Sequence, residues 1–120
     1  MAGITQFQQL DAWKEAHKLV LMVYRVTQSY PAEERYGLTS QMRRAAVSIP
    51  ANIAEGFKRR GIKDKIRFYN TSEGSLEEVK YFTILSNDLG YISSDTELMP
   101  QANTVGRLFH GLIASTERRQ

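Results

Sequence analysis

The stretch RRAAVSIPANIAEGFKRR, residues 43–60, decides the fold of this 120-residue chain. Apolar side chains recur there at steps of three and four residues, which predicts a helix with one buried face. The pattern extends beyond the stretch, and this face comprises Leu38, Met42, Ala45, Ala46, Ile49, Ile53 and Phe57. A second apolar stripe of Val47, Pro50 and Ala54 lies elsewhere on the helix. Such a stripe needs a cover, which predicts self-association; the alternative is a small bundle that wraps the helix on both sides.

Pro50 lies inside this helical pattern. A proline inside a helix removes one backbone hydrogen bond and usually kinks the helix, at a cost of about 3 kcal/mol. It could therefore divide the stretch into two short helices. We expect one kinked helix instead, because the apolar stripe keeps its phase across the proline.

The rest of the chain predicts an all-α protein with a single domain, residues 1–120. Four helices are expected, at about 9–29, 39–59, 63–89 and 95–118. Short connections make neighbouring helices antiparallel, so we expect an up-down-up-down four-helix bundle. Thr39 or Ser40 is expected to cap the second helix and Gly90 to end the third. Ser94 and Glu97 have the spacing of a capping box before the last helix.

The first helix is apolar around most of its circumference. One face comprises Leu10, Trp13, His17, Val20, Leu21 and Tyr24, and the other comprises Ala12, Ala16, Leu19, Val23 and Val26. Two such helices are hard to cover within a small bundle, which favours an oligomer. On the third helix, Phe68 is expected on the core face and Tyr69 off it. The predicted oligomer interface comprises Leu19, Val23, Val26, Val47, Pro50 and Ala54.

Composition excludes several kinds of chemistry. The chain has no cysteine, which excludes disulfides, thiolate metal sites and thiol nucleophiles. No stretch resembles a signal peptide or reaches transmembrane length, so a soluble cytoplasmic protein without a membrane partner is expected. No phosphate-binding loop, nucleophile elbow or metal motif is present, so no catalytic residue, cofactor or metal ligand is predicted. His17 is expected to be a core or interface residue, and a catalytic role is the alternative.

Positive charge is concentrated between residues 43 and 67. This segment has eight basic and two acidic residues, a net charge of +6, whereas the whole chain carries +3. An anionic partner is therefore expected there, although basic residues also suit a helix C-terminus and a solvated helix end is the alternative. Phe57 and Phe68 could stack on bases but are expected to be core residues. The candidate nucleic-acid-binding residues are Arg43, Arg44, Lys58, Arg59, Arg60, Lys63, Lys65 and Arg67.

Asn52 and Glu55 lie one turn apart on the second predicted helix. They could recognise a partner, or they could form a polar pair that fixes the register of two packed helices. We favour the second interpretation, because polar residues near an interface often set specificity.

Four stretches of the sequence resemble a known family. They are residues 43–60, DAWKEAHKLVLMVYRVT (11–27), ERYGLTSQ (34–41) and FYNTSEGSLEEVKYFTILSNDLGYI (68–92). Together they are similar to the four-helix-bundle proteins encoded within intervening sequences of bacterial large-subunit (23S) ribosomal RNA genes. The resemblance covers about residues 7–115. Its most specific parts are residues 52–56 (NIAEG), which end at Gly56, and Gly74 and Ser75 with Glu78 nearby. Ser72 departs from the alanine that is usual in the family.

The resemblance implies a non-enzymatic bundle, often a ring-shaped homopentamer with a central pore. It also implies kinship with the accessory variability protein of diversity-generating retroelements, which binds a reverse transcriptase and nucleic acid through a basic surface. We therefore expect a homo-oligomeric protein that binds RNA, DNA or a nucleic-acid enzyme. The alternative is a purely structural or protein-binding module. The expected number of five subunits rests on the resemblance alone. The resemblance implies no settled biochemical role.

Overall fold

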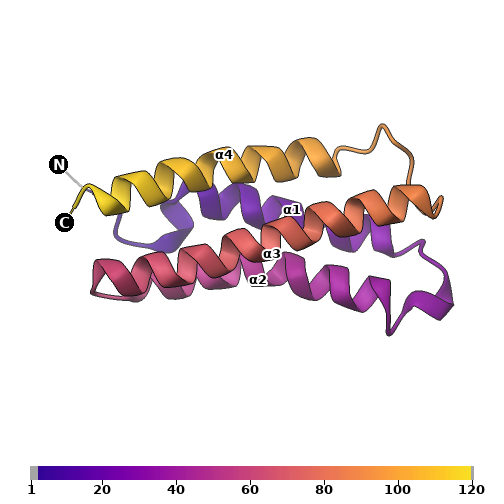
Figure 1. Ribbon diagram of the computed structural model, residues 1–120, viewed down its shortest axis with the longest axis horizontal. Helices are drawn as coiled ribbons and strands as arrows, with labels where there is room; N and C mark the ends of the chain where they lie inside the picture. The colour runs from indigo at the N-terminus through magenta and orange to yellow at the C-terminus, as the bar shows by residue number, and fades with distance from the viewer. Residues whose placement is uncertain (1–2, 120) are drawn as a thin grey trace.

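The four predicted helices are present in the computed structural model, which describes residues 3–119 (Figure 1). They are α1 (Asp11–Thr27), α2 (Leu38–Lys58), α3 (Ile62–Asp88) and α4 (Leu98–Glu117). Two short 3-10 turns, η1 (Phe7–Gln9) and η2 (Ala32–Glu34), precede α1 and α2. No strand occurs within residues 3–119, so the prediction of an all-α fold is confirmed. The ends of the predicted domain, residues 1–2 and 120, lie outside the described residues.

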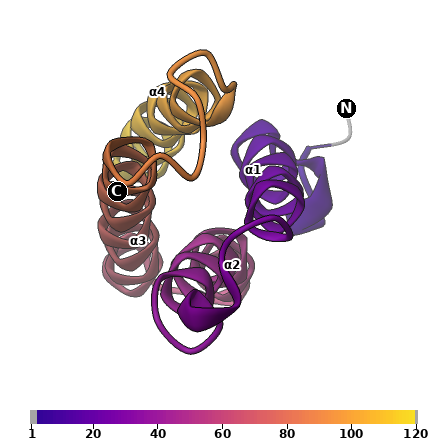
Figure 2. The same ribbon diagram turned by 90° about the vertical axis from the view of Figure 1, so that its right-hand side faces the viewer.

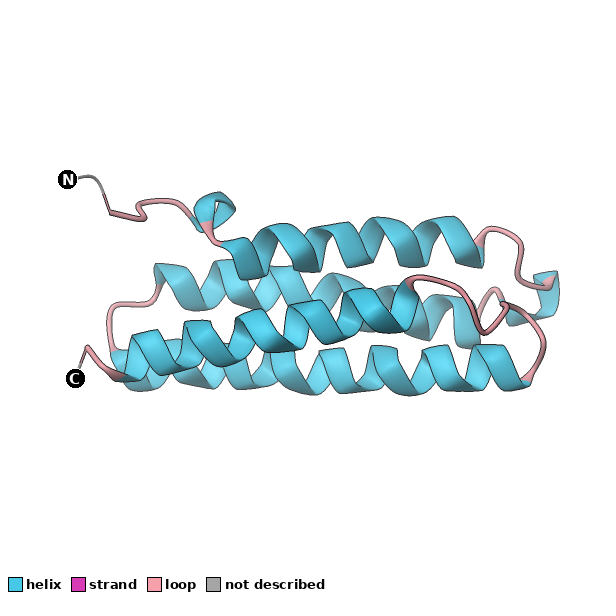
Figure 3. Ribbon diagram, turned by 90° about the horizontal axis from the view of Figure 1, so that it is seen from above, coloured by secondary structure: helices cyan, strands magenta, loops and turns pink. Residues whose placement is uncertain are grey.

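The helices form an antiparallel bundle in which each helix contacts its neighbours in chain order and α4 closes against α1 (Figure 2). The bundle is elongated, with extents of 48 × 25 × 19 Å, and its helices follow the long axis (Figure 3). The turn between α2 and α3 lies at the same end as η1 and the end of α4 (Figure 1). The α1–α2 and α3–α4 connections lie at the opposite end. This up-down-up-down course decides which distant residues meet.

One hydrophobic core, to which all four helices contribute, runs along the bundle. Leu19 and Val23, which were predicted to lie at an oligomer interface, are fully buried in this core, and Pro50 is buried as well. The prediction is wrong for these three residues. Both α2 and α4 pack against α1, and both α1 and α3 pack against α2, so the chain itself covers more apolar surface than the sequence indicated.

Helix α2 runs without interruption through Pro50, as expected. Beside the proline, the Ser72 hydroxyl of α3 donates a hydrogen bond of 2.9 Å to the carbonyl oxygen of Ile49. One turn further along α3, Ser75 donates to the Ser48 hydroxyl at 2.8 Å. These short side chains let α2 and α3 pack closely. An alanine at position 72 could not make the first of these bonds.

The close packing of α2 on α3 continues at Gly56. A β-carbon at this position would lie 2.7 Å from Cε1 of Tyr69 and 2.9 Å from Cβ of Phe68, closer than packed carbon atoms approach. The missing side chain makes room for the Tyr69 ring, which is buried, whereas Phe68 is half-buried. The prediction that placed Tyr69 off the core face is therefore wrong.

Helix α2 begins with Leu38, one residue earlier than expected, and its N-cap position is Gly37. The carboxylate of Glu34 accepts a hydrogen bond of 3.2 Å from the Leu38 N–H group. Thr39 and Ser40 lie inside the first turn, so neither caps the helix. A carboxylate from the preceding turn supplies the acceptor that a capping hydroxyl would have supplied.

In the connection between α3 and α4, Gly90 follows the end of α3 and has a positive φ of 78°. Glycine adopts this angle easily, so Gly90 has the conformation that its predicted capping role requires. The next N–H group, of Tyr91, donates to the Ser86 carbonyl at 2.9 Å and completes the cap. Helix α4 begins only at Leu98, with Glu97 itself at the N-cap position and no side-chain capping bond. The predicted capping box of Ser94 and Glu97 is therefore absent from this part of the described chain.

Candidate nucleic-acid interface

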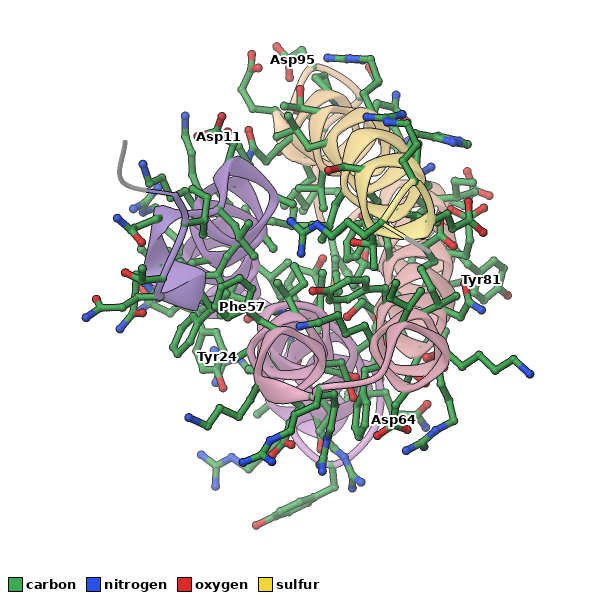
Figure 4. The ribbon with its side chains drawn as sticks, turned by 90° about the vertical axis from the view of Figure 1, so that its left-hand side faces the viewer. Asp11, Tyr24, Phe57, Asp64, Tyr81 and Asp95 are labelled. Atoms are coloured by element: carbon green, nitrogen blue, oxygen red, sulfur yellow. The ribbon has the colours of Figure 1, made fainter. Side chains whose placement is uncertain are left out.

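Basic side chains gather at the end of the bundle where α2 turns into α3, which is the end seen in Figure 4. Lys58 is the last residue of α2, Arg60 lies in the turn and Lys63 lies in the first turn of α3. All three side chains are exposed, and none forms an ion pair with another residue in the range 3–119. Unpaired cations that point into solvent create a positive potential that attracts phosphate groups.

Two further arginines at this end are held by ion pairs. Arg59 contacts Glu55 at 2.8 Å, and Arg67 contacts Asp64 at 2.8 Å. Their guanidinium groups lie 4.7 and 4.5 Å from the ring centroid of Phe68. The Phe68 ring is thus a half-buried platform for arginines rather than a core residue. A base that stacked on this ring would have to compete with these two cations.

Lys65 has a structural role within the same cluster. Its ammonium group donates at 2.6 Å to the carbonyl oxygen of Phe57, near the end of α2. It also lies 3.4 Å from the carbonyl oxygen of Gly56, which accepts a second hydrogen bond from the Arg59 N–H group. It also lies 5.2 Å from the Phe57 ring centroid. Burial lowers the pKa of Lys65, and the positive charge of Arg119 lowers that pKa further. Lys65 therefore positions the turn and contributes charge, but two of its three N–H donors are engaged.

Arg118 and Arg119 belong to this cluster, although neither is among the basic residues predicted from the sequence. They follow α4, whose end lies beside the α2–α3 turn, and both are exposed. The charge of Arg119 acts on the pKa values of both Lys65 and Tyr69, which places it close to α3. A signal was available: the antiparallel prediction already brings the end of the fourth helix to the same end as the second turn. We call Lys58, Arg60, Lys63, Arg118 and Arg119 the basic end.

Arg43 and Arg44 do not lie at the basic end. Fourteen residues of α2 separate Arg44 from Lys58, a rise of about 21 Å along the helix. Arg43 is anchored to α1: its Nε–H donates to the Thr27 hydroxyl at 2.8 Å, and its guanidinium lies 4.5 Å from the Tyr24 ring centroid. Arg44 is exposed. The eight predicted basic residues therefore divide into two groups on different parts of the surface.

Asn52 and Glu55 do not bond to each other or across to a facing helix. The Asn52 amide donates to the Ser48 carbonyl and hydroxyl at 2.8 and 2.9 Å, within α2. Glu55 pairs with Arg59, the residue that directly follows α2. The link between α2 and α3 passes instead through the Ser48 hydroxyl, which accepts from Ser75. The pairing that we expected across two helices is thus replaced by contacts inside one.

His17 is exposed and stacks on Trp13, with ring centroids 5.1 Å apart and an angle of 11° between the ring planes. The core position that we expected for it is therefore wrong, and an interface position stays a prediction. In residues 3–119, no three histidine, aspartate or glutamate side chains converge as metal ligands would. None of the helices described has both the length and the apolar composition that a membrane crossing requires.

Part of the predicted oligomer interface remains on the surface. Val47 of α2 is 42% exposed, and Leu21 and Tyr24 of α1 are 49% and 40% exposed. Val26 and Ala54 are half-buried. Figure 4 shows Tyr24 on the outer side of the bundle, where α1 meets α2. We call Leu21, Tyr24 and Val47 the apolar strip.

Two comparisons with known proteins indicate which family the chain belongs to. The comparison with curated proteins found no match. A sequence model described as 23S rRNA-intervening sequence protein matches residues 8–111, which include all of α1, α2 and α3 and most of α4. The match covers far more than half of the chain. The chain therefore belongs to the 23S rRNA-intervening sequence protein family.

Proposed function

We propose that this protein is a non-enzymatic, cytoplasmic, homo-oligomeric binding protein that holds RNA or DNA at its basic end. The observation that carries the proposal is the convergence of five exposed cations from the α2–α3 turn and the end of α4. Phosphate contacts of this kind give affinity that depends on salt and little on sequence. Arg59 and Arg67 lie over the Phe68 ring and compete with a base for it, so contact with the phosphate backbone is the expected mode of binding.

The test is the salt dependence of binding to a generic single-stranded RNA, measured by fluorescence anisotropy. The triple variant Lys58→Gln/Arg60→Gln/Lys63→Gln removes three exposed cations, so the slope of log K against log salt should become shallower by about two. A matched control, Lys18→Gln/Arg25→Gln/Arg107→Gln, removes the same charge from other exposed positions and should bind almost normally. Equal losses in both triples would show that only net charge matters and would contradict a localised site.

Self-association is the second part of the proposal, and the apolar strip supports it. Leu21 and Tyr24 lie one turn apart on α1, and Tyr24 and Val47 line the same cleft. These exposed apolar side chains are a surface that water disfavours and that a second copy could cover. The family resemblance implies five copies. In such a ring the basic ends would be repeated, and several weak phosphate contacts would act together.

Mass in solution tests this part. Val47→Glu places a charge in the apolar strip and should reduce the mass measured by light scattering to that of a 13.7 kDa monomer. Leu89→Glu, at an equally exposed leucine outside the strip, should leave the assembly intact. A parent protein that stays monomeric at high micromolar concentration would refute self-association.

A protein partner is the alternative occupant of the basic end. The resemblance points to a nucleic-acid enzyme such as a reverse transcriptase, and the apolar strip would suit a purely structural module. If the parent binds no RNA at low salt but the triple variant loses a co-purifying protein, the protein-binding alternative is correct.

A further inference from the structure

A second cationic surface lies at the opposite end of the bundle from the basic end. It is a cleft of about 890 Å³ between the last turns of α1, the η2 connection and the first half of α2. This volume falls within the range of about 300–1,000 Å³ that small-molecule sites occupy. The proposed RNA site at the basic end does not use this cleft, so ligand binding here does not depend on RNA binding. Tyr24 and Val47 of the apolar strip do line the cleft, so a second copy that covers the strip would compete with a ligand.

Arginine is the only charged residue type in the cleft. Arg35, Arg43 and Arg44 line it, and its described lining contains no aspartate or glutamate. Within residues 3–119, neither Arg35 nor Arg44 forms an ion pair. Guanidinium groups present N–H donors in a planar fork that matches phosphate oxygens. Three such groups in one hollow with no carboxylate favour a ligand with several negative charges.

Arg43 is already held in position for such a ligand. Its Nε–H donates to Thr27 and its Nη2 to the Tyr24 carbonyl at 3.4 Å, while the Tyr24 ring lies beneath the guanidinium. A guanidinium has five N–H groups, so Arg43 keeps donors beyond these two bonds. A donor fixed before binding loses little conformational entropy when a ligand arrives.

The cleft also offers aromatic and hydroxyl groups. The side chain of Tyr36 is 87% exposed on its lining, where an aromatic ring could stack. Thr39, Ser40 and Ser48 supply hydroxyls along the α2 side. Aromatic side chains stack on nucleobases, with a contribution of about 1–3 kcal/mol for each base. The combination of guanidinium groups, hydroxyls and an exposed ring corresponds to the phosphates, the sugar and the base of one ligand.

We propose that this cleft binds a nucleoside carrying two or more phosphates. The phosphates would lie between Arg43 and Arg44 with Arg35 nearby, and the base would lie against Tyr36. Stacking on Tyr36 is the contact assigned to the base, and every base can stack, so ATP and GTP should bind with similar affinity.

The test is calorimetric titration of the full-length protein with ATP at 0.15 M salt. We expect saturable binding of one ATP per chain. Arg35→Gln/Arg44→Gln removes two exposed guanidinium groups and should weaken binding by at least tenfold. Both side chains are exposed, so the thermal unfolding of this variant should match that of the parent. The triple variant of the basic end, Lys58→Gln/Arg60→Gln/Lys63→Gln, is the control and should bind ATP normally.

Four results would overturn the proposal. The first is binding that does not saturate by 1 mM ATP, and the second is a loss of ATP affinity in the basic-end triple variant as large as that in Arg35→Gln/Arg44→Gln. The third is an affinity for pyrophosphate equal to that for ATP, and the fourth is an affinity for adenosine equal to that for ATP. The third would make the ligand a polyphosphate without a base, and the fourth would remove the phosphates from recognition. If Arg35→Gln/Arg44→Gln lost RNA binding as well, the cleft would be part of the nucleic-acid surface rather than a separate site. RNA binding by this variant with loss of ATP binding would support two separate sites.

Discussion

At the scale of single residues, Gly56 is a position where the fold leaves no room for a larger side chain. Its hydrogen faces the ring of Tyr69, a side chain that is buried between α2 and α3. Gly74, in the middle of α3, has nothing within 4 Å of where its β-carbon would be. Both are helical glycines, and only the space around them differs.

Gly56→Ala and Gly74→Ala should therefore change stability in opposite directions. The first forces a methyl group against Tyr69 and should cost about 1–3 kcal/mol. The second removes backbone freedom from the unfolded chain without a clash and should stabilise by about 0.5–1 kcal/mol. Urea denaturation of the two variants beside the parent measures both effects. A Gly56→Ala protein as stable as the parent would show that the Tyr69 ring can move aside.

At the scale of elements, Glu34 ties together the two connections at one end of the bundle. One carboxylate oxygen accepts from the N–H group that begins α2, and the other accepts from the Tyr91 hydroxyl at 2.9 Å. Tyr91 follows the cap of α3, and its ring lies 5.1 Å from that of Tyr30. The pKa of Tyr91 is raised, mainly by the hydrogen bond to Glu34. Burial of the phenol and the negative charges of Glu34 and Glu33 raise this pKa further.

Stability should consequently fall at alkaline pH, and Tyr91→Phe should reduce that fall. A phenol whose pKa is higher in the folded than in the unfolded chain stabilises fully below the unfolded value of 10.0. This contribution is lost as the pH rises through the folded pKa. Burial also raises the pKa values of Tyr30 and Tyr69, which act in the same direction. The lowered pKa of Lys65 acts in the opposite direction, because its charged form is disfavoured in the folded chain.

Denaturation midpoints between pH 9 and 11.5 measure this effect. The slope for Tyr91→Phe should be shallower than that of the parent, and Tyr81→Phe, at an exposed ring on α3, should keep the parent slope. Identical slopes for all three proteins would mean that the Glu34–Tyr91 bond does not contribute to the alkaline transition.

At the scale of the whole molecule, antiparallel packing brings the end of α4 to the α2–α3 turn (Figure 1). The exposed Arg118 and Arg119 thereby join three cations that lie 55 or more residues earlier in the chain. Charge that the sequence distributes over two distant segments becomes one surface. The same geometry separates Arg43 and Arg44 from it, although the sequence placed them in the same basic segment.

Arg118→Gln/Arg119→Gln should therefore weaken RNA binding although neither residue lies in the basic segment. Loss of two phosphate contacts should make the slope of log K against log salt shallower by about 1.4 for single strands. ATP binding should remain, because the cleft lies at the other end of the bundle. Anisotropy and calorimetry measure the two ligands separately. An unchanged RNA slope would confine the interface to the α2–α3 turn.

Much of the fold could be predicted because helices are local structures. Every helix boundary lies within three residues of its predicted position, since periodicity, glycines and prolines act over a few neighbouring residues. The candidate site was predictable only in part. Lys58, Arg60 and Lys63 are exposed as expected, but Lys65 caps a helix and Arg43 is bound to α1, and both roles depend on contacts across the bundle.

The sequence by itself determined the helical class, the four segments, their antiparallel order and the excess of positive charge. Only the tertiary structure decided that Leu19 and Val23 are core while Leu21 and Tyr24 are surface, because a helix with apolar residues on all sides does not specify which side its neighbours cover. It also decided which cations meet. Burial and electrostatic potential depend on residues that are far apart in the chain, and the pattern of residues along one helix does not predict which distant residues will lie beside it.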